Sequence, residues 1–124
     1  MRDFQYRTKQ FLQGKTFERS TPLGPWLVTP DELPEGGWEV STEIDGETMQ
    51  RSTTAELVFT PVDLVVYLSA IVTLNPGDVI ATGTPGGVGH ARTPPRYLKD
   101  GNVLVTTVAG VGECRNLCRL EEER

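Results

Sequence analysis

The sequence contains few cysteine and histidine residues, which limits the metal and redox chemistry that it can support. Three residues separate its two cysteines, Cys114 and Cys118, and the chain offers neither a second cysteine pair nor a nearby histidine for a zinc site. In an extended segment the two side chains would lie about 13 Å apart, which is too far for a disulfide. We therefore expect two free thiols, as in a protein of the reducing cytoplasm.

The chain also lacks an excess of positive charge. Its 124 residues include 12 basic and 17 acidic side chains, which give a net charge of -5 and form no large basic cluster. Because binding to phosphate backbones needs such a cluster, we expect no nucleic-acid partner. Arg2, Arg7, Lys9 and Lys15 gather near the start, where they could meet an anionic substrate or remain solvated surface charges.

No apolar run is long enough to cross a bilayer. The longest candidate, residues 62–74, contains Asp63 and Ser69 and is shorter than the roughly 20 residues that a transmembrane helix needs. We therefore expect no membrane association.

Glycine and proline are abundant, with 13 and 9 residues, and 37% of the residues are hydrophobic. This balance favours a globule rich in strands and loops over a helical bundle. The length suits one domain.

Local patterns predict the main elements. Apolar and polar residues alternate over residues 38–44, Asp45-Gly46 supplies a tight turn, and residues 47–51 can return as the partner strand of a hairpin. Thr60-Pro-Val-Asp63 is typical of a helix start, and apolar residues then recur at helical spacing up to Val72. Further predictions are a short helix or turn over residues 4–12, a helical turn at residues 29–32, and largely buried strands at residues 79–82 and 103–108.

Residues 74–89 form the most informative segment, with the sequence Leu-Asn-Pro-Gly-Asp-Val-Ile-Ala-Thr-Gly-Thr-Pro-Gly-Gly-Val-Gly. Its glycines allow the backbone to approach a ligand closely, and Thr84 adds an exposed hydroxyl. A phosphate-binding P-loop is excluded, because no Gly-Lys-Ser/Thr follows and the next prolines cannot open a helix. The segment indicates a ligand-binding loop of another kind.

Several further motifs accompany this loop in a fixed order: Arg2-Asp-Phe-Gln5, Gly14-Lys-Thr-Phe17, Pro22-Leu-Gly-Pro25, Asp45-Gly46 leading to Gln50, and Gly110-Val-Gly-Glu113 followed by Asn116. With them, almost the whole chain resembles the fumarylacetoacetate hydrolase family, in particular its acylpyruvate-hydrolase-like members. The resemblance implies an α+β fold that is mainly β, the mixed β-roll of the family's C-terminal domain. It also implies that residues 1–124 are one partial, N-terminally truncated catalytic domain.

In this family two Glu and one Asp hold a divalent metal, Mg²⁺ or Mn²⁺, and many members use a His and a Glu of a lid segment to activate water. By the resemblance, all of these residues would lie upstream of Met1, so we expect no metal ligand in this chain. Asp3 follows the arginine of its motif, whereas the family's ligand precedes it, so we interpret Asp3 as a salt-bridge or hydrogen-bond partner.

The resemblance assigns four site residues. Lys15 would be the catalytic lysine that stabilises negative charge, Arg2 and Gln5 would bind substrate oxygens, and Thr84 would donate its hydroxyl to the substrate carboxylate. For Arg2 and Lys15 the ordinary interpretation is a solvated charge, and for Thr84 it is local turn capping.

Three other residues near the glycine-rich loop have weaker interpretations. His90, the only histidine, could approach a pocket mouth, but a loop hydrogen bond is the simpler interpretation. Arg92 and Arg96 could attract dianionic substrates or belong to a proline-stiffened surface loop.

The predicted function is metal-dependent hydrolysis of acylpyruvates, which are 2,4-dioxo acids such as fumarylpyruvate or acetylpyruvate, in the catabolism of aromatic compounds or in central metabolism. Oxaloacetate decarboxylation and 2-hydroxyhepta-2,4-diene-1,7-dioate isomerisation are alternatives from the same enolate chemistry. A further alternative is a catalytically incomplete fragment or subunit that acts as a binding or assembly module. We expect a homo-oligomer or a complementing N-terminal chain, because unpaired strand edges and exposed apolar surface favour association.

Overall fold

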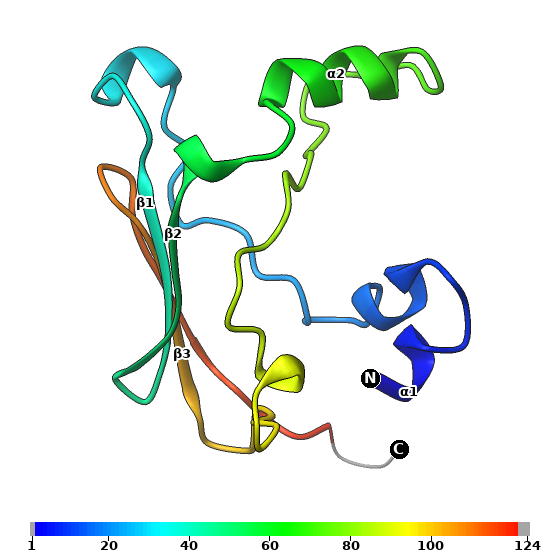
Figure 1. Cartoon of the computed structure of the whole chain (residues 1–124), viewed down its shortest axis with the longest axis vertical. Helices are drawn as coiled ribbons and strands as arrows, with labels where there is room; N and C mark the ends of the chain where they lie inside the picture. The colour runs from blue at the N-terminus through cyan, green and yellow to red at the C-terminus, as the bar shows by residue number, and fades with distance from the viewer. Residues whose placement is uncertain (1, 122–124) are drawn as a thin grey trace.

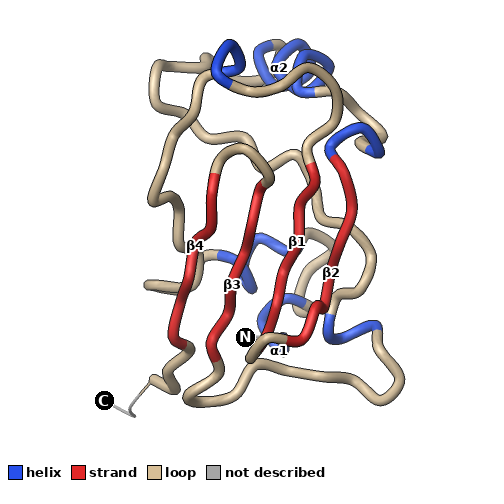
Figure 2. Tube along the Cα trace, turned by 90° about the vertical axis from the view of Figure 1, so that its left-hand side faces the viewer, coloured by secondary structure: helices blue, strands red, loops and turns tan. Residues whose placement is uncertain are grey.

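One antiparallel sheet organises the computed structural model, which describes residues 2–121 and, for Arg2, only the backbone. Its strands are β1 (Glu39–Ile44), β2 (Glu47–Thr53), β3 (Val103–Val108) and β4 (Gly112–Leu117), in the spatial order β2-β1-β3-β4. Figure 2 shows the four strands face on. The fold class, α+β and mainly β, is confirmed.

The predicted hairpin is confirmed as β1 and β2. Asp45 and Gly46 both have positive φ, 52° and 82°, as a two-residue turn between twisted strands requires. The Asp45 carboxylate accepts hydrogen bonds from the backbone N–H of Val103 at 2.8 Å and from Nδ2 of Asn102 at 2.6 Å. The hairpin turn is thereby tied to the start of β3, the other strand that the sequence predicted correctly.

Helix α2 (Pro61–Ser69) begins as predicted. The Thr60 side chain accepts from the backbone N–H of Asp63, and the Asp63 carboxylate accepts in return from the Thr60 backbone N–H, which completes a capping box. The helix ends at Ser69 and not at Val72. Figure 1 shows α2 standing at one end of the sheet, and none of its residues is buried.

The predicted strand at residues 79–82 is wrong, since these residues lie outside every strand and Val79 is 68% exposed. An apolar run becomes a buried strand only where a neighbouring strand supplies its backbone hydrogen bonds, and the four described strands pair only with one another.

The N-terminal segment also differs from its prediction. Helix α1 (Arg2–Gln5) ends early, the chain turns back, and the 3₁₀ helix η1 (Phe11–Lys15) follows it. An edge-to-face contact between Phe4 and Phe17, 5.2 Å between ring centroids, holds the two parts together. The other 3₁₀ turns are η2 (Pro30–Glu32), which was predicted, η3 (Thr54–Glu56) and η4 (Gly89–Ala91).

Few side chains are buried within the described residues: Ile44, Met49 and Val105 are the buried hydrophobic ones, and Gln5 is the buried polar one. The segment between α2 and β3 runs along one face of the sheet, on the side of α1 (Figure 1). This arrangement brings the glycine-rich segment against the sheet. Within residues 2–121, no helix has the length and apolar character needed to span a membrane.

Candidate functional site

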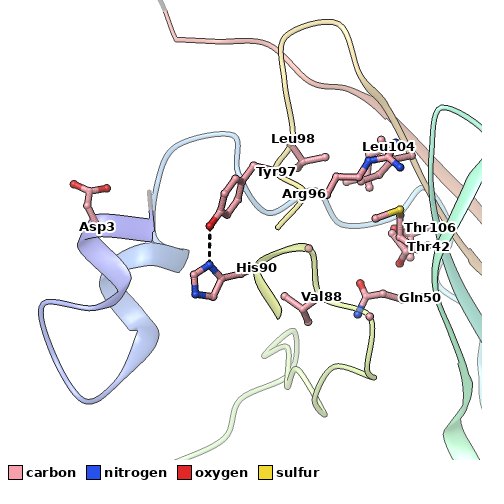
Figure 3. Close-up of a pocket in the computed structure, with 14 residues that line it drawn as sticks. Asp3, Thr42, Gln50, Val88, His90, Arg96, Tyr97, Leu98, Leu104 and Thr106 are labelled. Atoms are coloured by element: carbon pink, nitrogen blue, oxygen red, sulfur yellow. Dashed lines mark hydrogen bonds between the residues drawn. The ribbon is translucent and has the colours of Figure 1, made fainter. Parts of the chain in front are cut away.

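A cavity of about 770 Å³ separates one face of the sheet from the glycine-rich segment. Thr42 and Ile44 of β1 contribute to its floor together with Leu104 and Thr106 of β3, because alternate residues of a strand share a face. The facing wall comes from the segment 87–98 and from Asp3 of α1. Figure 3 shows polar side chains, among them Gln50, His90 and Arg96, on the wall of this cavity.

Gln50 of β2 holds the tip of the glycine-rich segment. Its amide nitrogen Nε2 donates to the Pro85 carbonyl at 2.9 Å and lies 3.4 Å from both Thr84 Oγ1 and the Gly86 carbonyl. A single side chain of the rigid hairpin therefore orients the loop that carries the Thr84 hydroxyl.

Arg92 forms a second tie between the loop and β2. Its Nε donates to the Gly87 carbonyl at 3.1 Å, and its Nη2 donates to the Met49 carbonyl at 2.5 Å. The planar guanidinium suits this bridge, because its donors point in fixed directions. Arg92 is thus engaged with the backbone of the protein, and Arg96 forms an ion pair with Glu47.

The approach of the loop to β2 requires glycine at position 87. Gly87 has φ of +94°, and a Cβ built on it would lie less than 3.0 Å from the Met49 carbonyl oxygen. The neighbouring Gly86 has open space around its position. Packing therefore requires glycine at position 87 but not at position 86.

The residues assigned by resemblance fall into two groups. Gln5 is buried and packs against Gly14, where an added Cβ would lie 2.6 Å from the Gln5 Cβ, so Gln5 adjoins the turn that presents the exposed Lys15. Thr84 lies with Gln50 at the loop. The side chain of Arg2 lies outside the described residues. Lys15, Gln5 and Thr84 are not among the residues that line the cavity.

His90 does form a hydrogen bond within its loop region, and it also lines the cavity. Its Nδ1 lies 2.8 Å from the Tyr97 hydroxyl, and the Tyr6 ring contacts the imidazole at 5.5 Å between centroids. The sequence analysis missed Tyr97 and Tyr6, since nothing in the local pattern around either residue pairs it with His90.

The described residues do not fit a divalent metal on their own. No group of three or more His, Cys, Asp or Glu side chains with suitable placement occurs among them. Three such ligands are the usual minimum for a catalytic metal. The two cysteines are free and half-buried, and burial together with the negative charge of Asp45 raises the pKa of the Cys118 thiol.

Residues 1–119 match the family model for the fumarylacetoacetate (FAA) hydrolase C-terminal domain. The chain belongs to the fumarylacetoacetate hydrolase family. The mitochondrial oxaloacetate tautomerase Fahd2a of Rattus norvegicus is 44% identical over 113 residues, which are 90% of this chain and 36% of that protein.

Solved structures of the fumarylacetoacetate hydrolase family agree with the fold. The fumarylacetoacetate hydrolase of Exiguobacterium antarcticum superposes with a TM-score of 0.90 at 38% identity, over 97% of this chain and 43% of that one. The maleylpyruvate hydrolase of Sphingobium sp. SYK-6, in complex with manganese (II) and pyruvate, gives 0.66 at 33% identity, over 76% and 33%. The chain therefore spans less than half the length of these relatives.

Proposed function

We propose that this member of the fumarylacetoacetate hydrolase family takes part in hydrolysis of acylpyruvates, 2,4-dioxo acids such as fumarylpyruvate or acetylpyruvate. The observation that supports the proposal is the glycine-rich loop, which carries Thr84 and which Gln50 and Arg92 fasten to β2. A relative that binds pyruvate together with manganese supports the same substrate class.

In the proposed reaction, water adds to the 4-keto carbon, the bond between C3 and C4 breaks, and pyruvate leaves as its enolate. The acyl part keeps the oxygen of the water as a carboxylic acid, and the second proton of the water balances the protonation of the enolate at C3. Thr84 donates its hydroxyl to the substrate carboxylate, while Arg2 and Gln5 bind further substrate oxygens. Lys15 places a positive charge beside the developing enolate. Gln5 packs on Gly14, the residue before Lys15, and this proximity supports a joint role for Gln5 and Lys15 in the proposed site.

A divalent cation, Mg²⁺ or Mn²⁺, belongs to this proposal, and it would stabilise the enolate charge when bound. Because the described residues bring no three ligands together, the carboxylates that hold it must come from other residues. Oxaloacetate decarboxylation and isomerisation of 2-hydroxyhepta-2,4-diene-1,7-dioate share the enolate chemistry and remain alternative reactions for the same residues.

The second candidate is a catalytically incomplete module that works only in an assembly. The exposure of α2 favours it: Val62, Val66 and Tyr67 are 70%, 65% and 66% exposed on a helix that contains no buried residue. A helix that is apolar on most sides normally packs against a partner. We propose a homo-oligomer or a complementing chain as that partner, in the cytoplasm, where the two free thiols would stay reduced.

The deciding experiment follows the ultraviolet absorbance of an acylpyruvate enol incubated with the purified chain, with and without Mn²⁺. Lys15→Ala is compared with Lys9→Ala, a matched change at another exposed lysine of the same segment. Metal-dependent turnover that only Lys15→Ala abolishes supports hydrolysis by this chain. A folded chain without turnover, which sedimentation shows to self-associate, supports the assembly module instead.

A further inference from the structure

Gln50 occupies a place in β2 where the pairing of the strands is irregular. Its partner in β1 is Thr42, whereas Thr48 pairs with the next residue, Glu43. Met49 is therefore an extra residue of β2, and an extra residue bends a strand and changes the direction of the side chains beside it. Figure 3 shows the Gln50 side chain pointing from the sheet toward the glycine-rich loop.

The amide of Gln50 has a defined orientation at this loop. Its Nε2 lies 2.9 Å from the Pro85 carbonyl oxygen and 3.4 Å from that of Gly86. Carbonyl oxygens only accept, so they select the nitrogen of the amide for this place and not its oxygen. One N–H bonds Pro85, and the other is shared between Gly86 and the Thr84 hydroxyl oxygen, which also lies at 3.4 Å. Gln50 is thus a donor toward Thr84.

This donor determines what the Thr84 hydroxyl can offer to a ligand. A hydroxyl has one hydrogen and two acceptor lone pairs. Within residues 2–121, the bond from Gln50 is the hydrogen bond that the Thr84 side chain makes, and it occupies a lone pair. Thr84 is also exposed. Its hydrogen is therefore available to a bound group, and a carboxylate, which has acceptors only, is the best match.

We propose that Gln50 is a positioning residue that makes Thr84 select a carboxylate over a neutral amide. The inference rests on the proposed function, in which the Thr84 hydroxyl binds the substrate carboxylate. Gln50 needs no contact with the substrate, because it acts through the hydroxyl oxygen of Thr84. An acceptor in place of the Gln50 nitrogen would draw the Thr84 hydrogen toward the sheet and leave only lone pairs for the ligand.

The test is a titration of the full chain with pyruvate and with pyruvamide, its neutral amide, followed by nuclear magnetic resonance of the backbone amides. Gln50→Glu places an acceptor of nearly the same shape beside Thr84. We expect it to reduce the preference for pyruvate over pyruvamide by about tenfold, the effect of one hydrogen bond to a charged group. Gln10→Glu makes the same change at an exposed glutamine of another segment and should leave the preference unchanged.

Thr84→Val separates the effect of the hydroxyl from direct charge repulsion. Valine keeps the shape of the side chain, so Gln50→Glu in this background should reduce the preference only about threefold, through repulsion across water. An equal reduction in both backgrounds would show that Gln50 does not act through Thr84, and the inference would be overturned. Where the added charge prevents folding, Gln50→Met removes the donor alone and should reduce the preference about fivefold; an unchanged preference in that protein also overturns the inference.

The outcomes separate the inference from the function beneath it. If Thr84→Val weakens pyruvate binding and Gln50→Glu weakens both ligands equally, Gln50 merely holds the loop, and the proposed function stays intact. If the wild-type chain does not bind pyruvate, or if Thr84→Val does not weaken the binding, the proposed role of Thr84 is contradicted and the inference falls with it.

Discussion

Replacing Gly87 by alanine tests whether the glycine-rich loop is fixed by its close approach to β2. Two costs act together at this position. An alanine at φ of +94° costs about 1–2 kcal/mol because its Cβ crowds the following carbonyl oxygen. The same Cβ would also lie less than 3.0 Å from the Met49 carbonyl oxygen, which is backbone and cannot rotate aside.

Relieving that overlap requires the loop or β2 to move, at a cost of about 1–3 kcal/mol. We therefore expect Gly87→Ala to lower the free energy of unfolding by about 2–5 kcal/mol. With a urea m-value of about 1.5 kcal/mol/M, a loss of about 3 kcal/mol would lower the urea midpoint by about 2 M. The motion would also break the bond of Arg92 to the Gly87 carbonyl.

Urea denaturation followed by tryptophan fluorescence measures the change, and two neighbouring glycines serve as controls. Gly86→Ala has open space and should change the stability by less than about 1 kcal/mol. Gly83→Ala, at φ of +135° with no atom within 4 Å, carries only the conformational cost of about 1–2 kcal/mol. Equal midpoints for Gly87→Ala and Gly86→Ala would refute the packing argument.

Two further changes test the ties at the loop and at α2. Arg92→Lys keeps the charge but cannot reach both carbonyls, so it should cost about 2 kcal/mol and increase hydrogen exchange at residues 84–88; unchanged exchange would show that Gln50 alone holds the loop. Hydrogen bonds from the Thr60 hydroxyl and backbone N–H lower the pKa of Asp63 below 3.8. This contribution is present above the unfolded pKa and is lost as the pH falls through the lowered one, so helical circular dichroism should decrease in strong acid. Asp63→Asn should weaken the cap at neutral pH, and identical acid titrations of both proteins would count against the capping box.

Features that depend on near neighbours in sequence were predictable. The hairpin follows from alternation around Asp45-Gly46, and the start of α2 follows from Thr60 and Asp63, because the interacting groups lie within a few residues. The family followed from ordered motifs for a related reason: a glycine loop must keep specific residues at specific spacing to hold its conformation.

Features that depend on distant neighbours were not predictable. The segment 79–82 has the composition of a buried strand, but strand formation needs a partner that composition cannot supply. The role of Gln50 depends on Pro85, 35 residues away, and that of Arg92 on Met49, 43 residues away. The sequence around Arg92 and Arg96 gave no sign that Arg92 would bond backbone carbonyls and that Arg96 would form an ion pair with Glu47.

The sequence alone determined the local elements, the family and the residue types available for enolate chemistry. Only the tertiary structure decided which of these residues meet. It placed Gln50 against the loop that carries Thr84, and His90 in contact with Tyr6 and Tyr97 on the cavity wall. The physical reason is that turns and caps are stabilised within a few residues, whereas a cavity exists only where segments far apart in the chain are brought together by the sheet that both contact.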